Sequence, residues 1–401
     1  MSAGLEVSPG VGRQGARRTS ILNHPRFRAF ASQAGLVVVL VVFFAWIVNN
    51  AIVNLSRAHI ASGFGFLSGR AGFDISQTLI SYSIESTYGR AFLVGLLNTL
   101  LVAIIGIVLA SAIGFTLGIA RLSKNWIVAR VAAVYIETLR NVPVLLQLLF
   151  WYKAVLSLLP GPREALLLPF SASLSNRGLF VPKPIPGNGF MATLVALVVA
   201  ILAAVVVASW ARRRQMATGR QFPTLRVNFA IVVLVPLAVF LATGAPLSFE
   251  LPVLQGFNYV GGVVVRPEFL ALELGLSLYT ATFIAEIVRG GILAVSHGQT
   301  EASYALGLQP GRTLRLVVIP QALRVIIPPL TNQYLNLTKN SSLAVAIGYP
   351  DLVGVFAGTV LNQTGQAVEV IFITMLVYLA ISLLTSLLMN WFNRSVALRE
   401  R

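Results

Sequence analysis

Residues 95–121 read GLLNTLLVAIIGIVLASAIGFTLGIAR, and no charged residue precedes Arg121 in this run. An α-helix rises about 1.5 Å per residue, so about 20 apolar residues cross a hydrocarbon core about 30 Å thick. The run therefore predicts a membrane-spanning helix. Its surroundings agree, because 56% of the 401 residues are hydrophobic and only 11% are charged, whereas about 25% of the residues of a soluble domain are charged.

Seven further apolar stretches lie on either side of this run. We therefore predict an all-α integral membrane protein with eight transmembrane helices. Including the first run, the spans are expected at about 35–53, 92–120, 131–159, 190–209, 229–247, 269–289, 322–347 and 368–391.

Basic residues are distributed unevenly among the loops that connect these spans. Twenty Lys and Arg residues lie in the N-terminal arm, the C-terminal tail and the loops on the same side, and seven lie in the opposite loops. Cytoplasmic loops carry the excess of Lys and Arg, so both termini are predicted to be cytoplasmic. This bias also accounts for the net charge of +17. Nucleic-acid binders gather basic residues on one polar face, so we expect no nucleic-acid partner.

The composition argues against several kinds of chemistry. The chain has no cysteine, and His24, His59 and His297 are far apart, so no spacing indicates a metal site. No G-x-x-x-x-G-K-[ST] loop is present to hold the phosphates of ATP. We therefore expect no catalytic residues, no metal and no cofactor bound by this chain.

The segment 296–320 is predicted to form two short helices joined by a turn on the cytoplasmic side. Thr300 is expected to cap the first helix, with Glu301 in its first turn, where the helix dipole favours an acid. Gly307 and Pro310 then end it. Such a turn, rich in small residues, suits close docking on a partner protein. The alternative interpretation is an amphipathic connector that docks on no partner.

This segment resembles the cytoplasmic loop of the binding-protein-dependent ABC importer permeases, E-A-A-x-x-x-G followed, after nine intervening residues, by I-x-L-P. Ser303, Val317 and Ile319 depart mildly from that pattern. In the family this loop docks on the ATPase subunit. The residues to which the resemblance assigns the coupling role are Gln299, Glu301, Ala302, Ser303, Gly307, Ile319 and Pro320.

The resemblance narrows to the polar amino-acid importers over 95–121, 137–152, 279–302 and 320–344, and the arm and first loop are similar to the large permease subunits of general L-amino-acid importers. It implies an ATP-driven importer of a broad range of L-amino acids in the bacterial inner membrane. The implied partners are a periplasmic binding protein, a second permease, an ATPase dimer that carries ATP and Mg, and membrane lipid. The chain itself would not be an enzyme.

The chain is expected to fall into four parts. They are a basic cytoplasmic arm (1–34), a first helix with a periplasmic loop (35–91), an ABC permease domain (92–391) and a cytoplasmic tail (392–401). Residues 160–268 are expected to be an insertion within the permease domain that adds two helices. Because two is an even number, the coupling segment stays on the cytoplasmic side.

A polar stripe marks the predicted seventh span, where Asn332, Asn336 and Asn340 recur every four residues and so share one helix face. Lipid does not satisfy such a face, so it either lines the solute path or forms a polar seam between helices. Pro328 and Pro329 are expected to kink the helix beside it. The candidates for the path are Gln147, Asn332, Asn336, Lys339 and Asn340.

Two pairs of opposite charges lie three residues apart within the predicted spans, Glu137 with Arg140 and Glu286 with Arg289. Residues at this spacing meet on one helix face. We interpret both pairs as structural charge neutralisation.

An ion-coupled secondary transporter of amino acids is the alternative function. It should show an internal inverted repeat with broken helices in both halves. The sequence shows one candidate broken helix and no matching repeat.

Overall fold

The structure is a computed structural model that describes residues 25–57 and 62–396. The chain divides into two units, which are treated separately. One unit contains helix α1 (Pro25–Arg57), which includes the predicted first span. Most of the predicted basic arm and residues 397–401 of the tail lie outside the described residues.

The other unit contains nearly all the remaining elements. Seven helices of the described chain are long and apolar enough to cross a membrane, or eight if a bent pair counts as one span. This confirms the predicted type of fold. The helices are α2 (Tyr88–Arg121), α3 (Trp126–Asn141), α4 (Val144–Leu149), η3 (Phe150–Leu156), α5 (Phe190–Thr218), α6 (Thr224–Ala242), α7 (Pro267–Leu293), α8 (His297–Ala305), α9 (Pro310–Thr313), η5 (Leu314–Val318), α10 (Ile319–Asn340), η6 (Ser341–Ile347), η7 (Val353–Val360), α11 (Leu361–Thr364) and α12 (Ala367–Val396), with short turns η2 (Phe64–Ser68) and η4 (Pro162–Glu164).

The centre of this unit is the pair α2 and α7, against which α10 packs. Small residues recur every four positions on the buried face of α2, namely Gly106, Ala110, Gly114 and Gly118. A Cβ atom added to Gly114 would lie 2.6 Å from Cβ of Ile284. The two helices therefore approach more closely than larger side chains allow, as small residues permit in membrane proteins.

The predicted span 131–159 is not one straight helix. Helix α3 ends before Pro143, and the next helical stretch turns away from it by 104°. Proline has no N–H to donate and pushes the residue before it toward extended backbone, and Val142 has φ −94° and ψ 126°. The Gln147 side chain stabilises the break, because its Nε2 donates to the carbonyls of Leu139 (2.7 Å) and Val142 (3.0 Å).

The prediction of an all-α protein missed eight short strands in the part of the chain that the structure describes. They form an antiparallel sheet in the order β1-β2-β3-β8 and two separate two-stranded antiparallel sheets, β4–β5 and β6–β7. The strands lie in two loops, one before α5 and one after α6, and prolines interrupt any helix in both. The two loops pair with each other through β3 with β8 and β4 with β5. The strands are β1 (Leu166–Leu168), β2 (Ala172–Ser175), β3 (Gly178–Val181), β4 (Lys183–Pro186), β5 (Leu247–Glu250), β6 (Val253–Gln255), β7 (Asn258–Val260) and β8 (Val263–Val265).

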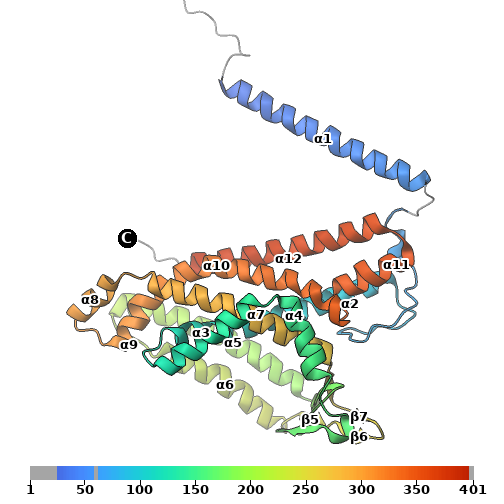
Figure 1. Cartoon of the computed structure of the whole chain (residues 1–401). Coiled ribbons are helices and arrows are strands. Elements are labelled where there is room, and N and C mark those ends of the chain that lie inside the picture. The colour runs from blue at the N-terminus through green and yellow to red at the C-terminus, as the bar shows by residue number, and fades with distance from the viewer. Residues whose placement is uncertain (1–24, 58–61, 397–401) are drawn as a thin grey trace, which may run out of the picture. The chain divides into compact units, whose positions relative to one another are not determined.

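Helices α5 and α6 pack on each other, and Nδ2 of Asn228 donates to the carbonyl of Ala204 across that contact (2.9 Å). The strands β5, β6 and β7 lie at one end of this unit, and α8 and α9 lie at the opposite end (Figure 1). The two ends of the bundle therefore carry different structures, as is expected of a membrane protein that presents different surfaces to the two sides of the membrane.

Helix α10 runs from Ile319 to Asn340 through Pro328 and Pro329. The helix therefore does not break at the two prolines beside the asparagines. The irregular stretch comes earlier, in the π-helical η5 that connects α9 to α10. A π-type turn widens the helix by one residue, and such turns are rare but often lie at functional sites.

Candidate functional site

The predicted coupling segment folds into a helix, a tight turn and a second helix. Helix α8 begins at His297, so Thr300 lies inside the helix and does not cap it. Gly307 ends the helix with φ +76°. Its N–H donates to Tyr304 (2.9 Å), and the N–H of Leu308 donates to Ser303 (3.0 Å). This is the Schellman arrangement that favours glycine at the left-handed position.

Most of this turn is exposed and partly apolar. Tyr304, Leu306 and Leu316 present large apolar side chains. We call these three residues with Glu301 and Ala302 the coupling surface. Exposed apolar side chains grouped at one place on a protein indicate a contact with a partner.

Two side-chain hydrogen bonds end on Gln299 of α8, one from within the same helix and one from the helix that follows the turn. Ser303 is buried, and its Oγ donates to the Gln299 carbonyl (2.7 Å). The Nε2 of Gln321 donates to Oε1 of Gln299 (3.3 Å). Ile319 and Pro320 form the first turn of α10. The predicted coupling residues thus connect α8 directly to the helix that bears the asparagines.

The asparagines lie on an uncovered side of α10. Asn332, Asn336 and Lys339 are exposed and Asn340 is half-buried, and we call these four residues the asparagine face. The opposite side of the helix is buried through residues such as Leu337. The predicted helix face is therefore formed, with its polar side turned away from the core of this chain.

A hollow of about 290 Å³ borders this face. Asn336 and Asn340 line it from α10, where sequence reasoning also missed Gln333. The residues that line it from α7 are Tyr279, Thr280 and Phe283. Aromatic rings beside amide groups provide both apolar contact and hydrogen bonds, which is how small-molecule sites are usually built.

Gln147, the fifth path candidate, is not among the residues that line this hollow. It is 4% exposed, and its amide nitrogen is occupied by the two carbonyls at the break after α3. Its observed role is to stabilise the bend, which does not favour contact with a solute.

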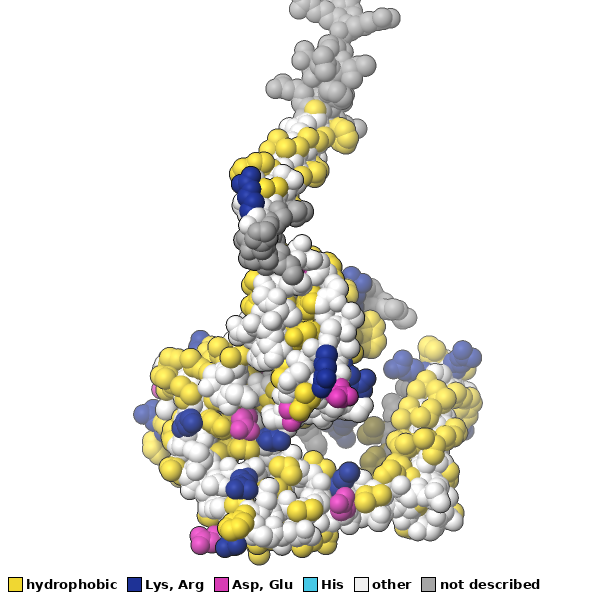
Figure 2. All heavy atoms as spheres, turned by 90° about the vertical axis from the view of Figure 1, so that its right-hand side faces the viewer, with side chains coloured by type: hydrophobic (Ala, Val, Ile, Leu, Met, Phe, Trp, Pro, Cys, Tyr) yellow, Lys and Arg dark blue, Asp and Glu magenta, His cyan; other side chains and the backbone are white. Residues whose placement is uncertain are grey.

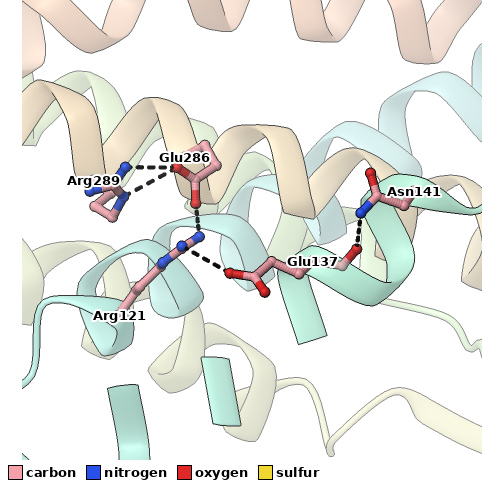
Figure 3. Close-up of polar contacts among 5 residues, drawn as sticks. All are labelled: Arg121, Glu137, Asn141, Glu286 and Arg289. Atoms are coloured by element: carbon pink, nitrogen blue, oxygen red, sulfur yellow. Dashed lines mark hydrogen bonds and ion pairs between the residues drawn. The ribbon is translucent and has the colours of Figure 1, made fainter. Parts of the chain in front are cut away.

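One of the two predicted charge pairs is present and the other is not. Glu286 pairs with Arg289 at 3.1 Å. Glu137 pairs instead with Arg121 at 3.4 Å, and the same Arg121 also pairs with Glu286 (Figure 3). Arg140 lies over the ring of Phe283 at 5.1 Å from its centroid. The predicted partner of Glu137 was wrong because a charge from α2 lies within reach.

Arg121 is the residue of this network that sequence reasoning missed. It closes α2 after a long apolar run, and its partner on α7 is 165 positions away. The signal was the stripe of small residues on α2, which predicts a closely packed neighbour helix but does not identify it.

Across the described residues, no group of three or more His, Asp or Glu side chains is arranged to hold a metal ion. The features that the structure brings forward are instead an exposed helical turn, an uncovered polar helix face and an ion-pair network.

The binding-protein-dependent transport system inner membrane component family matches residues 196–399. The chain is 57% identical over 382 residues to the general L-amino acid transport system permease protein AapQ of Rhizobium johnstonii, covering 95% of each chain. It is 53% identical over 378 residues to the putative amino-acid ABC transporter permease protein YhdX of Escherichia coli, covering 94% of this chain and 96% of that one.

A third relative is the glutamate/glutamine/aspartate/asparagine transport system permease protein BztB of Rhodobacter capsulatus, 42% identical over 423 residues, with 97% of this chain and 98% of that one covered. These relatives are permease subunits of ABC transporters and not ion-coupled carriers or enzymes. The chain therefore belongs to the binding-protein-dependent ABC transporter permeases, in the group that carries amino acids.

Proposed function

We propose that this chain moves a broad range of L-amino acids from a periplasmic binding protein across the bacterial inner membrane. The names of two relatives support this range, because one is a general L-amino acid permease and another is a glutamate/glutamine/aspartate/asparagine permease. In this proposal ATP and Mg bind to a separate ATPase dimer, and this chain binds no cofactor.

The observation that carries the proposal is the asparagine face. Asn332, Asn336 and Lys339 are exposed on a helix long and apolar enough to span a membrane. Amide and ammonium groups facing lipid would lack hydrogen bonds, which costs several kcal/mol for each group. A second, related permease that closes over this face supplies both the missing cover and the other wall of a path.

The functional assignment of these residues follows from their chemistry. The amides of Asn336 and Asn340 donate and accept hydrogen bonds, so they suit both the carboxylate and the ammonium of an amino acid. Lys339 adds a positive charge for the carboxylate. The alternative is that the same face forms only a polar seam with the second permease, in which case the solute passes elsewhere.

The coupling surface is proposed to dock on the ATPase dimer. ATP binding there would draw the α8 turns of the two permeases together, and η5 would pass that movement to α10. This assignment requires α8 on the cytoplasmic side, and the excess of Lys and Arg in the loops on that side supports it. Both termini are then cytoplasmic.

Uptake by reconstituted vesicles tests the proposal. The chain, its second permease, the ATPase and the binding protein are placed in liposomes with ATP inside. We expect uptake of labelled L-amino acids that requires ATP and the binding protein and that persists when ionophores collapse ion gradients. Uptake that ionophores abolish, or that this chain performs alone, would contradict it.

The variant Asn336→Leu distinguishes an asparagine face that lines the solute path from one that only forms a polar seam with the second permease. If the face lines the path, uptake falls by about tenfold or more while the complex still assembles, because one lost polar contact costs roughly 1–3 kcal/mol. If the face is only a seam, the complex dissociates in detergent. Val325→Leu, an exposed apolar position on the same helix, is the matched control and should leave both measurements unchanged.

A further inference from the structure

A second hollow lies at the end of the bundle that bears the strands, away from α8. It encloses about 430 Å³ and is lined by the strands, by η3 and by the first turn of α7. This volume lies within the range of about 300–1,000 Å³ that is typical of small-molecule sites. We call it the outer pocket. Its lining includes Tyr152, Lys153, Arg177, Phe180, Arg266 and Glu268.

Three cations line the outer pocket from three different elements. Lys153 comes from η3, Arg177 from the turn between β2 and β3, and Arg266 from the residue before α7. Within the described part of the chain none of the three takes part in an ion pair. Figure 2 views this end of the unit and shows basic side chains with acidic ones beside several of them.

One carboxylate and several neutral polar groups complete the lining. Glu268 accepts a hydrogen bond from the hydroxyl of Tyr152 at 3.0 Å, which fixes both side chains. Asn176 and Asn258 add amides. The pocket thus offers positive and negative groups together, with donors and acceptors between them.

The floor of the pocket is apolar. Phe180 is buried and packs against the ring of Tyr259, with 4.7 Å between centroids. Val264 is paired with Phe180 across the sheet and also lines the pocket. An apolar floor of this kind accepts an uncharged side chain.

We propose that the outer pocket binds a free α-amino acid as a zwitterion, at a site separate from the asparagine face. Lys153, Arg177 and Arg266 hold the carboxylate, Glu268 holds the ammonium, and Phe180 with Val264 contacts the side chain. The choice of an amino acid among zwitterions rests on the proposed function, and the charges alone specify only the zwitterion.

The outer pocket is lined by both positive and negative side chains, and this favours a zwitterion over a simple anion. Phosphate or an acidic side chain would use the three cations but would be repelled by Glu268. A zwitterion uses both. The cations are exposed, so each contact is screened and weak. We therefore expect a dissociation constant on the order of 1 mM, suited to a site that exchanges quickly with the surrounding solution.

Ligand-observed NMR on the full chain in lipid nanodiscs tests the proposal with three probes of one shape. They are L-leucine, 4-methylpentanoate, which lacks the ammonium, and L-leucinamide, which lacks the carboxylate. L-Leucine should bind about fivefold or more tightly than either analogue. Equal binding of leucine and 4-methylpentanoate would overturn the zwitterion assignment, and no leucine signal at about 20 mM would overturn the site.

Variants locate the binding. The double variant Arg177→Gln/Arg266→Gln should weaken leucine binding by about tenfold or more, and Glu268→Gln should bring leucine to the level of 4-methylpentanoate. Arg163→Gln is the matched control, because Arg163 is exposed near the same strands and is not among the lining residues of the outer pocket. It should leave leucine binding unchanged.

The asparagine face provides the decisive contrast. If Asn336→Leu abolishes leucine binding and the double arginine variant does not, the molecule has one site on α10 and the proposal is wrong. Failure of the proposed function looks different, since it would abolish ATP-dependent uptake while leucine binding and its loss in the arginine variant persist.

Discussion

Arg121 at the end of α2 forms an ion pair with Glu286 of α7, and the same guanidinium lies 3.4 Å from a carboxylate oxygen of Glu137 on α3 (Figure 3). One side chain therefore joins three helices at the end of the bundle near α8. The side chains of Arg121 and Glu286 are 23% and 20% exposed, so solvent screens this pair less than an ordinary surface pair.

We expect Arg121→Gln to lower the free energy of unfolding by about 1–2 kcal/mol. The loss is smaller than the 3–5 kcal/mol typical of a fully buried pair, because Glu286 keeps Arg289. Thermal unfolding in detergent measures it. Arg130→Gln, at an exposed position on α3, is the control. An unchanged melting temperature in Arg121→Gln would show that the network contributes nothing to stability.

Gly307 is held at φ +76°, and a Cβ atom there would meet nothing within 4 Å. Any loss in Gly307→Val therefore comes from backbone strain, about 1–2 kcal/mol for a left-handed L-residue, and not from a clash. We expect uptake to fall by about tenfold or more while membrane insertion persists, because the coupling surface is displaced. Gly307→Asn should retain most activity, since asparagine tolerates this conformation better.

The control for the turn is Gly311→Val, because Gly311 also has open space but no positive φ. Uptake by that variant should stay near normal. Normal uptake by Gly307→Val would mean that the geometry of the turn does not matter for coupling.

Asp351 lies between two spans and is buried, and burial raises its pKa from the ordinary 3.8 to about 7. The unfolded chain then loses this proton at lower pH than the folded chain, so the contribution of Asp351 to stability falls as pH rises from about 4 to about 7 and is constant above. We expect Asp351→Asn to raise the melting temperature by several degrees at pH 8.

At pH 4 the two proteins should melt together, because the neutral carboxyl and the amide are alike. Asparagine also keeps an oxygen for the N–H of Gly354, which lies 2.8 Å from Oδ1 of Asp351. A stability difference that is equal at both pH values would contradict the role given to the charge.

Glu273 is buried on α7, and neither of its carboxylate oxygens has a hydrogen-bond partner among the described residues. A Cβ atom on Gly106 of α2 would lie 3.4 Å from one of these oxygens. A buried polar group without a partner costs about 1–3 kcal/mol, and more when it is charged, so an apolar side chain of similar size removes that cost. We expect Glu273→Met to raise the melting temperature.

Glu164→Met, at an exposed position, is the control for Glu273→Met and should not change the melting temperature. A clear drop in the melting temperature of Glu273→Met would reveal a partner for the carboxylate, such as ordered water.

The sequence was sufficient for features that depend on local pattern. The apolar run that ends at Arg121 predicts a membrane span. The four-residue spacing of Asn332, Asn336 and Asn340 predicts a shared helix face. Both predictions follow from helix geometry alone. The turn at Gly307 follows from the same kind of signal. What these patterns leave open is which helix lies beside which.

Features that join distant segments were the ones missed. Glu137 had a plausible partner at Arg140, and only the packing of α2 on α3 makes Arg121 the nearer charge. The pairing of β3 with β8 joins residues about 85 positions apart, and it is this pairing that assembles the outer pocket. The bend at Pro143 was missed because the apolar run over 131–159 predicts one span, and a proline alone does not specify the 104° by which the chain turns.

The account depends on the coupling surface facing the cytoplasm and contacting a separate ATPase. The chain has no cysteine, so Ala302→Cys places a single reactive thiol on that surface. Labelling by a membrane-impermeant maleimide should occur in inside-out vesicles and not in right-side-out ones, and added ATPase subunit should protect the thiol. Labelling from the outside of right-side-out vesicles, or no protection by the ATPase, would contradict the account.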